Sequence, residues 1–447
     1  MLQTLRNAWK IEELRRKLLF MLLIVLIYRL GNAVTVPYID GALLSQYFAG
    51  QQNTILGLLN TMSGSALERA SIFALAIQPY INASIIIQLL TIAIPALERL
   101  SKEGGEEGKK KLEKATRYAT IAIALLQGYG YYSILRYAGS VDMISASAPA
   151  VWAPIVIIGT FMAGSVLVMW MGEQITEFGI GNGISVILFV SIVSRFPAQI
   201  GSIISGITAP KTVAGDVAGE LVKNPSYVPW WLALLMLLGA LAIMVLIVIV
   251  NDAERRIPVQ YTKQTRGRRQ YGGQSTHLPI KVNMSGVLPI IFAQSIASVP
   301  ATITGFVPRW KDSWVSTHFN TTNWPYIIIY FLLIVFFSYF YSTIQMNPIE
   351  ISNNLKKNGG LIPGIRPGKP TSEFISKTLR KVTFFGAIYL AIIAIVPLII
   401  SHFSESARNS GIQLGGTSII IVITVALETI KQLEAQMLVR HYKGFLE

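Results

Sequence analysis

Four histidines are the residues of this chain with the most obvious capacity for chemistry, because imidazole can bind metal ions or transfer protons near neutral pH. They are His277, His318, His402 and His441, and all lie in expected loops or in the C-terminal tail. No two of them share a helical face, as an HExxH zinc site requires. The chain has no cysteine, which excludes disulfides, thiolate metal sites and a cysteine nucleophile. We therefore expect no metal site and no histidine-based catalysis.

A glycine-rich basic segment at 95–115 resembles a phosphate-binding loop only superficially. The glycines before Gly108 and Lys109 have the wrong spacing for a Walker A motif, and no strand precedes them. We expect no nucleotide and no other cofactor to bind this chain.

Carboxylates are scarce where catalysis or ion coupling would need them. Glu428 is the only acidic residue inside a long apolar stretch, and it lies near one end of that stretch. Ion-coupled transporters usually place an acid or a lysine in the middle of the membrane. What remains is a set of amide and hydroxyl groups among aliphatic residues, and the chain is not expected to be an enzyme.

The amides and hydroxyls are concentrated at 71–94, a stretch long enough to span a membrane. It carries Gln78, Pro79, Tyr80, Asn82, Ser84 and Gln88. An apolar piece at 55–62 precedes it and is too short to cross a hydrocarbon core of ~30 Å. Unpaired polar groups are costly in lipid. The pattern fits a lined cavity or a closed pore, and it equally fits a re-entrant loop beside a helix packed on its neighbours.

Composition places these segments in a membrane protein. The 447 residues are 52% hydrophobic and only 14% charged, where soluble domains carry roughly 25% charged residues. Ten stretches can span as helices: 18–36, 71–94, 116–137, 150–171, 184–204, 229–251, 286–306, 324–346, 382–401 and 415–433. None alternates as a transmembrane β-strand would. The predicted fold class is an all-α polytopic membrane protein.

The distribution of basic residues predicts the topology. With residue 1 inside, 29 lysines and arginines fall in or beside the inside segments and 6 in the outside segments. By the positive-inside rule both termini are cytoplasmic.

The longest outside connection, 206–228, divides the chain into an N-terminal half (1–205) and a C-terminal half (229–447), each with five spans. A repeat with an odd number of spans inserts its second copy upside down, which predicts inverted halves. The second span of each half carries a proline followed by polar residues: Pro79, Asn82 and Ser84 in one, and Pro289, Gln294, Ser295 and Ser298 in the other. We expect these two helices to face each other.

Two inside loops are long and basic. Loop 252–285 has two β-prone runs around a basic tip, predicting a hairpin that projects from the membrane. Loop 347–381 contains Lys356, Lys357 and Arg366. These projections either bind an anionic partner, such as RNA phosphates or an acidic protein, or are merely solvated.

Five motifs resemble the bacterial SecY family of protein-conducting channels. They are SIFALAIQPYINASIIIQLL (71–90), GEQITEFGIGNGIS (172–185), GGQSTHLPIKVN (272–283), NPIEISNNLKKNGGLIPGIRPGKPT (347–371) and GGTSIIIV (415–422). The resemblance covers nearly the whole chain, in order. It implies ten helices in two inverted halves around a central hourglass pore.

The resemblance also implies how such a pore is closed. An aliphatic pore ring would comprise Ile77, Ile81, Leu188, Ile291 and Ile421, with Leu188 in place of the expected isoleucine. The segment 55–64 would be a plug, with Ile55, Leu56, Leu58, Leu59, Met62 and Gly64 as its sealing and turning residues.

Signal sequences would leave sideways through a lateral gate at Asn82, Ser84, Gln294, Ser295 and Ser298. Docking of the SecA ATPase or the ribosome would use Arg255, Arg256, Arg266, Arg268, Arg269, Lys356, Lys357 and Arg366. The implied partners are the SecE and SecG subunits, SecA, the ribosome, preproteins and membrane lipids, in the bacterial plasma membrane.

Two other functions remain as alternatives. A secondary transporter with inverted repeats is disfavoured by the missing mid-membrane acids and by the large basic loops. A lipid scramblase or flippase would also need a lateral opening, but it would not explain the plug.

Overall fold

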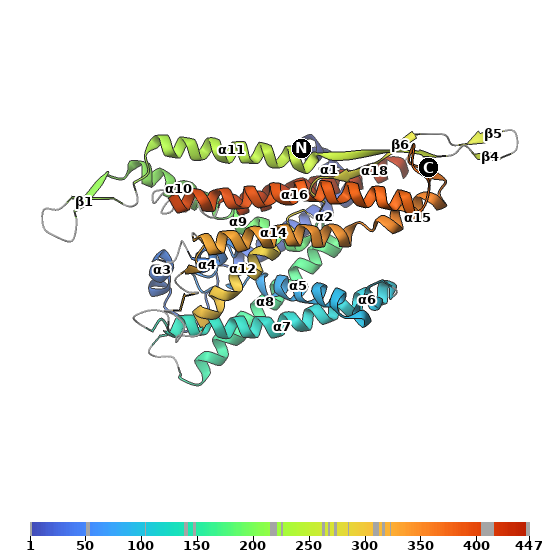
Figure 1. Ribbon diagram of the computed structural model, residues 1–447. Helices are drawn as coiled ribbons and strands as arrows, with labels where there is room; N and C mark the ends of the chain where they lie inside the picture. The colour runs from blue at the N-terminus through green and yellow to red at the C-terminus, as the bar shows by residue number, and fades with distance from the viewer. Residues whose placement is uncertain are drawn as a thin grey trace.

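The computed structural model is a bundle of long helices with small β-structures at both ends (Figure 1). It describes residues 2–50, 54–102, 104–137, 142–145, 149–214, 221–224, 227–261, 264–266, 269–271, 275–284, 286–306, 313–314, 318–321, 323–403 and 415–443.

The first half contains α1 (Leu2–Lys10), α2 (Glu12–Gly31), α3 (Gly41–Gly50), α4 (Ile55–Met62), α5 (Gln78–Ala93), α6 (Pro95–Lys102), α7 (Gly105–Tyr137), α8 (Trp152–Phe178), α9 (Gly183–Val193) and α10 (Phe196–Thr208). The strands β1 (Thr212–Ala214) and β2 (Leu221–Lys223) follow. The second half contains α11 (Trp230–Asp252), β3 (Glu254–Tyr261), β4 (Gln264–Arg266), β5 (Arg269–Tyr271), β6 (Ser275–Lys281), α12 (Leu288–Phe306), α14 (Trp324–Gln345), α15 (Pro348–Lys357), β7 (Gly360–Leu361), α16 (Lys369–Phe403) and α18 (Gly415–Lys443).

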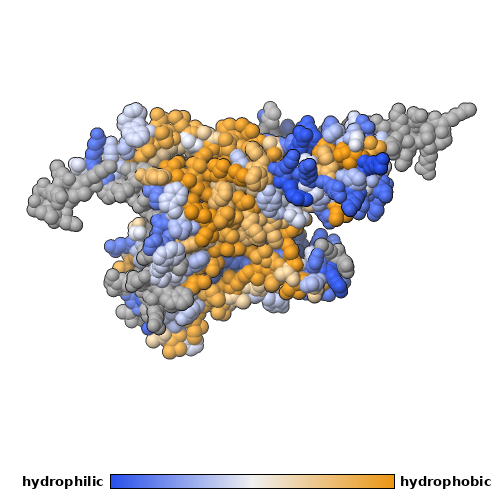
Figure 2. Space-filling view, in the orientation of Figure 1, coloured by the Kyte–Doolittle hydropathy of each residue, from blue (hydrophilic) through white to orange (hydrophobic). Residues whose placement is uncertain are grey.

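Within the described residues, five helical segments are each long and apolar enough to cross a membrane: Trp152–Phe178, Gly183–Thr208, Trp230–Asp252, Trp324–Lys357 and Lys369–Phe403. The pair Gln78–Ala93 and Pro95–Ser101, bent by 106°, makes a sixth if it counts as one span. Figure 2 shows a broad apolar band across the bundle with polar residues gathered at both ends. This is a polytopic helical membrane protein, as predicted.

Helix occupies each of the ten predicted ranges, but two of them differ from the expected continuous spans. In the range 71–94 the helix begins only at Gln78, after a series of turns. Pro79 in the first turn explains that start, because proline has no N–H to donate and fits where the helix needs none. In the range 184–204 the span is interrupted at Ser194 and Arg195, between α9 and α10.

The two long basic loops form one unit rather than the two separate projections expected. The hairpin prediction for 252–285 is confirmed, since β3 pairs with β6 antiparallel from Glu254 opposite Lys281 to Gln260 opposite Ser275. Residue Leu361 of the other loop then pairs with Gln260, so the sheet order is β6-β3-β7. A small apolar core joins this sheet to α15 and α16: Ile257, Val259, Ile280, Leu355, Ile362 and Ile375.

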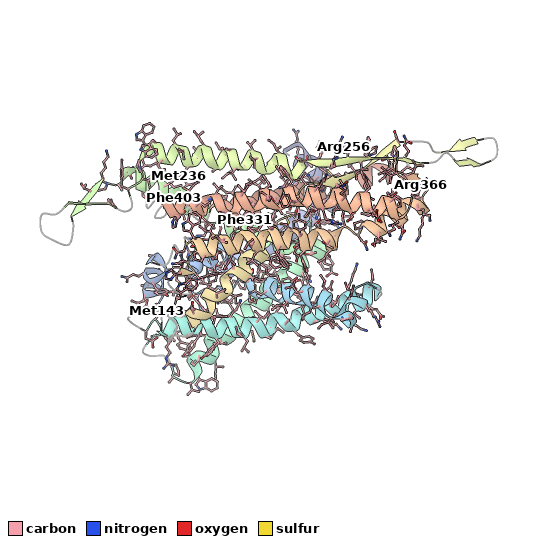
Figure 3. All side chains as sticks on the ribbon, in the orientation of Figure 1. Met143, Met236, Arg256, Phe331, Arg366 and Phe403 are labelled. Carbon is pink, nitrogen blue, oxygen red and sulfur yellow. The ribbon has the colours of Figure 1, made fainter. Side chains whose placement is uncertain are left out.

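The side chains at the two ends of the bundle differ in kind. Arg256 and Arg366 lie at the end that carries the sheet β6-β3-β7, which we call the basic end, and Phe403 lies at the opposite end (Figure 3). Near that opposite end α8, α11 and α14 begin with the exposed tryptophans Trp152, Trp230 and Trp324. Exposed aromatic residues of this kind are typical of a membrane–water interface.

Candidate functional site

The five aliphatic side chains predicted as a pore ring are all buried in the largest apolar cluster of the described residues. Ile77 and Ile81 come from the start of α5, Leu188 from α9, Ile291 from α12 and Ile421 from α18. None of the five is more than 3% exposed. Residues from both halves of the chain therefore meet in one sealed apolar region.

Two glycines allow α8 and α9 to approach closely beside this region. A Cβ atom on Gly183 would lie 1.9 Å from the carbonyl oxygen of Gly172, so no side chain fits there. A Cβ on Gly172 would in turn lie 3.4 Å from Ile77 Cδ1. The glycine-rich turn before α9 thus permits a close helix–helix contact that sets the position of Leu188.

The segment predicted as a plug begins with a short helix, α4, against the same cluster. Leu58 and Met62 are buried members of the cluster, and Leu59 packs against it. Leu56, Leu59 and Met62 also line the neighbouring cavity, whereas the side chain of Ile55 lies outside the described residues. Gly64 follows with a φ of +71°, which favours glycine. The segment predicted as a plug therefore packs against the side chains predicted as a ring.

The two helices predicted to face each other, α5 and α12, do pack together, and a side-chain hydrogen bond joins them. Gln78 Nε2 donates to Ser295 Oγ at 3.3 Å. The hydroxyl of Ser298 donates to the carbonyl oxygen of Ser295 within α12 at 2.7 Å. This line of polar side chains between α5 and α12 is called the seam below.

The other predicted gate residues occupy different places. Asn82 lines the cavity beside the seam. Gln294 is buried, and its Oε1 has no hydrogen-bond partner in the described part of the chain. Ser84 accepts a hydrogen bond at 3.2 Å from Gln88 Nε2 on its own helix, so in this structure its hydroxyl does not bridge α5 and α12.

Sequence reasoning missed two contributors to this region. Tyr341 on α14 donates its hydroxyl hydrogen to Gln88 Oε1 on α5, which extends the contact between the halves beyond α12. Gln127 on α7 lines the cavity, and its buried Oε1 has no hydrogen-bond partner among the residues that the structure describes. An amide in the middle of the apolar range 116–137 was a usable signal. Tyr341 had none, because it lies among several other aromatic residues.

A cavity of about 450 Å³ lies between α4, α5, α7 and α12. Its lining is mostly aliphatic, including Ile85, Leu89, Ile123, Leu126, Ile296, Val299 and Ile303. A helix ~10 Å wide and ~30 Å long is too large to enter this cavity whole. The cavity can therefore receive part of an apolar helix, and a whole one requires the helices to separate.

The basic residues predicted for docking gather at the basic end. Arg255, Arg256, Lys356, Lys357 and Arg366 are exposed on the unit formed by the two loops. Arg256 also pairs with Glu254 at 2.6 Å. Arg266 and Arg269 are opposite each other in the β4–β5 pairing, and Arg268 lies outside the described residues.

Comparisons with known proteins agree with this geometry. Residues 71–430 match the family model described as SecY. The chain is 42% identical over 457 residues to the protein translocase subunit SecY of Streptomyces galbus, and 40% identical over 465 residues to that of Mycobacterium tuberculosis. These alignments cover 100% of both chains in each case.

Solved structures support the same fold. A protein-conducting channel aligns with a TM-score of 0.63 at 15% identity, covering 94% of this chain and 92% of the other. Sec61 from a canine ribosome-channel complex aligns with a TM-score of 0.59 at 13% identity, with the same two coverages. The arrangement of helices, the sequence matches and the family model together show that this chain belongs to the SecY family.

Proposed function

We propose that this SecY-family channel subunit, which is not an enzyme, passes unfolded polypeptides across the bacterial plasma membrane through the region where ring and plug now meet. The observation that carries the proposal is the convergence of Ile77, Ile81, Leu188, Ile291 and Ile421, from four separate helices, with plug residues in one buried cluster. The five predicted ring side chains carry no charge and no polar group that would bind a small solute or an ion.

An aliphatic constriction suits the passage of a polypeptide. It excludes water and ions by dewetting when closed, and it offers no polar partner that would hold one residue of a moving chain. Leu188 keeps the aliphatic character and volume of the isoleucine that the family resemblance suggests, so it should preserve the seal. The plug, with Leu58 and Met62 buried against the same cluster, adds a second barrier.

The seam between α5 and α12 is the proposed lateral gate. A signal sequence is an apolar helix, and the aliphatic cavity beside Asn82 would receive part of it before the helices separate. The hydrogen bond from Gln78 to Ser295 is long at 3.3 Å and joins neutral groups, so its loss costs little. Sideways release into lipid would follow the separation of α5 and α12.

The basic unit is the proposed docking surface for the SecA ATPase or the ribosome, which would supply the energy. Its exposed arginines and lysines suit an RNA backbone or an acidic protein surface. Two of the matched solved structures are described as ribosome-bound, the canine Sec61 complex and the idle yeast Ssh1 complex. SecE and SecG remain the expected partners in the membrane.

Both termini are proposed to be cytoplasmic. The hydroxyl of Thr4 on α1 donates to Glu434 on α18 at 3.0 Å, so the described N- and C-terminal helices meet on one side of the bundle. Lysines and arginines are concentrated in the segments assigned to that side.

Disulfide formation with a stalled substrate tests the pore directly, because the chain has no cysteine of its own. A single cysteine replaces Ile291, and a secretory chain with one cysteine is stalled midway through export and oxidised. The proposal expects a disulfide at Ile291→Cys and none at Leu237→Cys, a control on the exposed face of α11. No bond at Ile291→Cys, with Asn82→Cys also silent, would favour a transporter instead.

A further inference from the structure

The interruption between α9 and α10 places an arginine next to the plug. Arg195 lies in that break, half-buried, and its Nη1 donates a hydrogen bond of 2.7 Å to Thr61 Oγ1 on α4. Thr61 is 2% exposed, so this contact is shielded from solvent. It connects the segment predicted as a plug to the turn between α9 and α10 by a charged group.

The hydroxyl oxygen of Thr61 is free to accept the hydrogen bond from Arg195. Its hydroxyl donates to the carbonyl oxygen of Gly57 in the preceding turn at 3.0 Å, which leaves its lone pairs available to an outside donor. The next contact holds the plug to the chain that follows it. Asn60 Nδ2 donates to Glu68 Oε2 at 2.6 Å, and the backbone N–H of Glu68 donates to Asn60 Oδ1 at 3.1 Å.

The end of the plug also fits closely against the turn that precedes Arg195. A Cβ on Gly64 would lie 3.0 Å from both the carbonyl oxygen of Ser191 and the hydroxyl of Ser194. Ser191 is itself fixed by a 2.8 Å hydrogen bond to the hydroxyl of Tyr28 on α2. The last turn of α9 is therefore a rigid support that holds Arg195 in reach of Thr61.

The arginine is only partly compensated in this position. Its Nε is buried without a hydrogen-bond partner among the described residues. Glu68 attracts it electrostatically, but the two form no ion pair in the described part of the chain. Burying a guanidinium with incomplete pairing is costly. Such a contact can hold the plug and still give way when the plug moves and Arg195 gains water.

We propose that Arg195 is a latch that positions the plug in the closed channel through its hydrogen bond to Thr61. This inference rests on the plug role proposed above and adds the residue pair that sets how readily the plug leaves. Arg195 acts through Thr61 and is therefore a positioning residue. It does not need to contact the translocating polypeptide.

A double-mutant cycle tests the latch. Arg195→Gln, Thr61→Val and the combined variant are compared with the parent and with Arg69→Gln, a control at an exposed arginine of the segment after the plug. The measurements are ion conductance in planar bilayers without substrate, and export of a preprotein with a shortened apolar signal. Each single variant should raise resting conductance and weak-signal export about tenfold, which corresponds to ~1.4 kcal/mol.

Non-additivity is the decisive result. If the hydrogen bond carries the effect, the combined variant equals the stronger single variant, and Arg69→Gln equals the parent. The latch would be overturned if the fold-increases in conductance of the two single variants multiplied in the combined variant. It would also be overturned if both single variants had the resting conductance of the parent. Should Arg195→Gln fail to accumulate in the membrane, Thr61→Val decides alone, since it preserves the shape of the side chain.

Export of a normal preprotein on the same membranes separates the two proposals. A parent protein that exports nothing would contradict the proposed function. A parent that exports normally, beside variants with unchanged conductance, would contradict only the latch.

Discussion

Gln78 on α5 and Ser295 on α12 are joined by a 3.3 Å hydrogen bond, although they are 217 residues apart in the chain. The bond lies between the two helices whose proline and polar residues suggested that they face each other. It is long and joins neutral groups, so the two halves are held together here by a weak polar contact within an apolar surround.

Replacing Asn82 by leucine should tighten this seam. Asn82 lines the cavity among aliphatic side chains, and a leucine there removes a polar group that hydrocarbon disfavours. Export should then require a more apolar signal sequence than the parent needs. The measurement is export across a series of signals of graded length, with Ile86→Leu, at another cavity-lining position on α5, as the control. An Asn82→Leu channel with an unchanged requirement would contradict the prediction.

Removing the hydroxyl of Tyr341 should have the opposite effect. This hydroxyl donates to Gln88 across the α5–α14 contact, and a neutral hydrogen bond contributes about 0.5–1.5 kcal/mol. The Tyr341→Phe channel should therefore export proteins with weakly apolar signal sequences up to about tenfold faster than the parent. Tyr339→Phe, two residues away on the same helix, serves as the control and should behave as the parent does.

Local sequence predicted the helices well because apolar runs long enough to span leave few other structures possible. It did not predict where each helix would be interrupted. Pro79 lies in the first turn of α5, yet Pro300 and Pro397 lie inside α12 and α16. Neighbouring helices in a membrane can compensate the hydrogen bond that a proline removes, so the outcome depends on packing that the local sequence does not contain.

The residues of the candidate site likewise fall into those that the local sequence could indicate and those that it could not. The polar residues of α5 were visible as amides and hydroxyls out of place in lipid, whereas the ring residues were assigned through the family resemblance. The sequence alone does not distinguish an aliphatic residue that seals a pore, such as Ile291, from one that faces lipid. Contacts such as that of Arg195 with Thr61 could not be predicted, because they join segments that are 134 residues apart.

Charge reversal at Arg366 should reduce translocation without preventing membrane insertion of the channel. Arg366 is exposed on the basic unit, where a glutamate would repel the phosphates or acidic surface of a docking partner. Export driven by SecA and binding of ribosomes are the two measurements. Arg99→Glu, an exposed arginine on α6 outside the basic unit, should leave both near the parent values. Normal export and binding by Arg366→Glu would refute the docking role.

Gly183→Ala should destabilise the protein, because the new methyl group would lie 1.9 Å from the carbonyl oxygen of Gly172. That oxygen belongs to the backbone of α8 and cannot turn away, so α8 and α9 must separate. Overpacking of this kind costs about 1–3 kcal/mol or more.

The measurement is the midpoint of heat-induced loss of monodisperse protein in detergent. Gly201→Ala on α10 is the matched control, since nothing lies within 4 Å of its added Cβ. The control should hold or slightly raise the midpoint, because alanine favours a helix over glycine by roughly 1 kcal/mol. If both variants unfold at the parent temperature, the close contact of α8 and α9 does not set the position of Leu188.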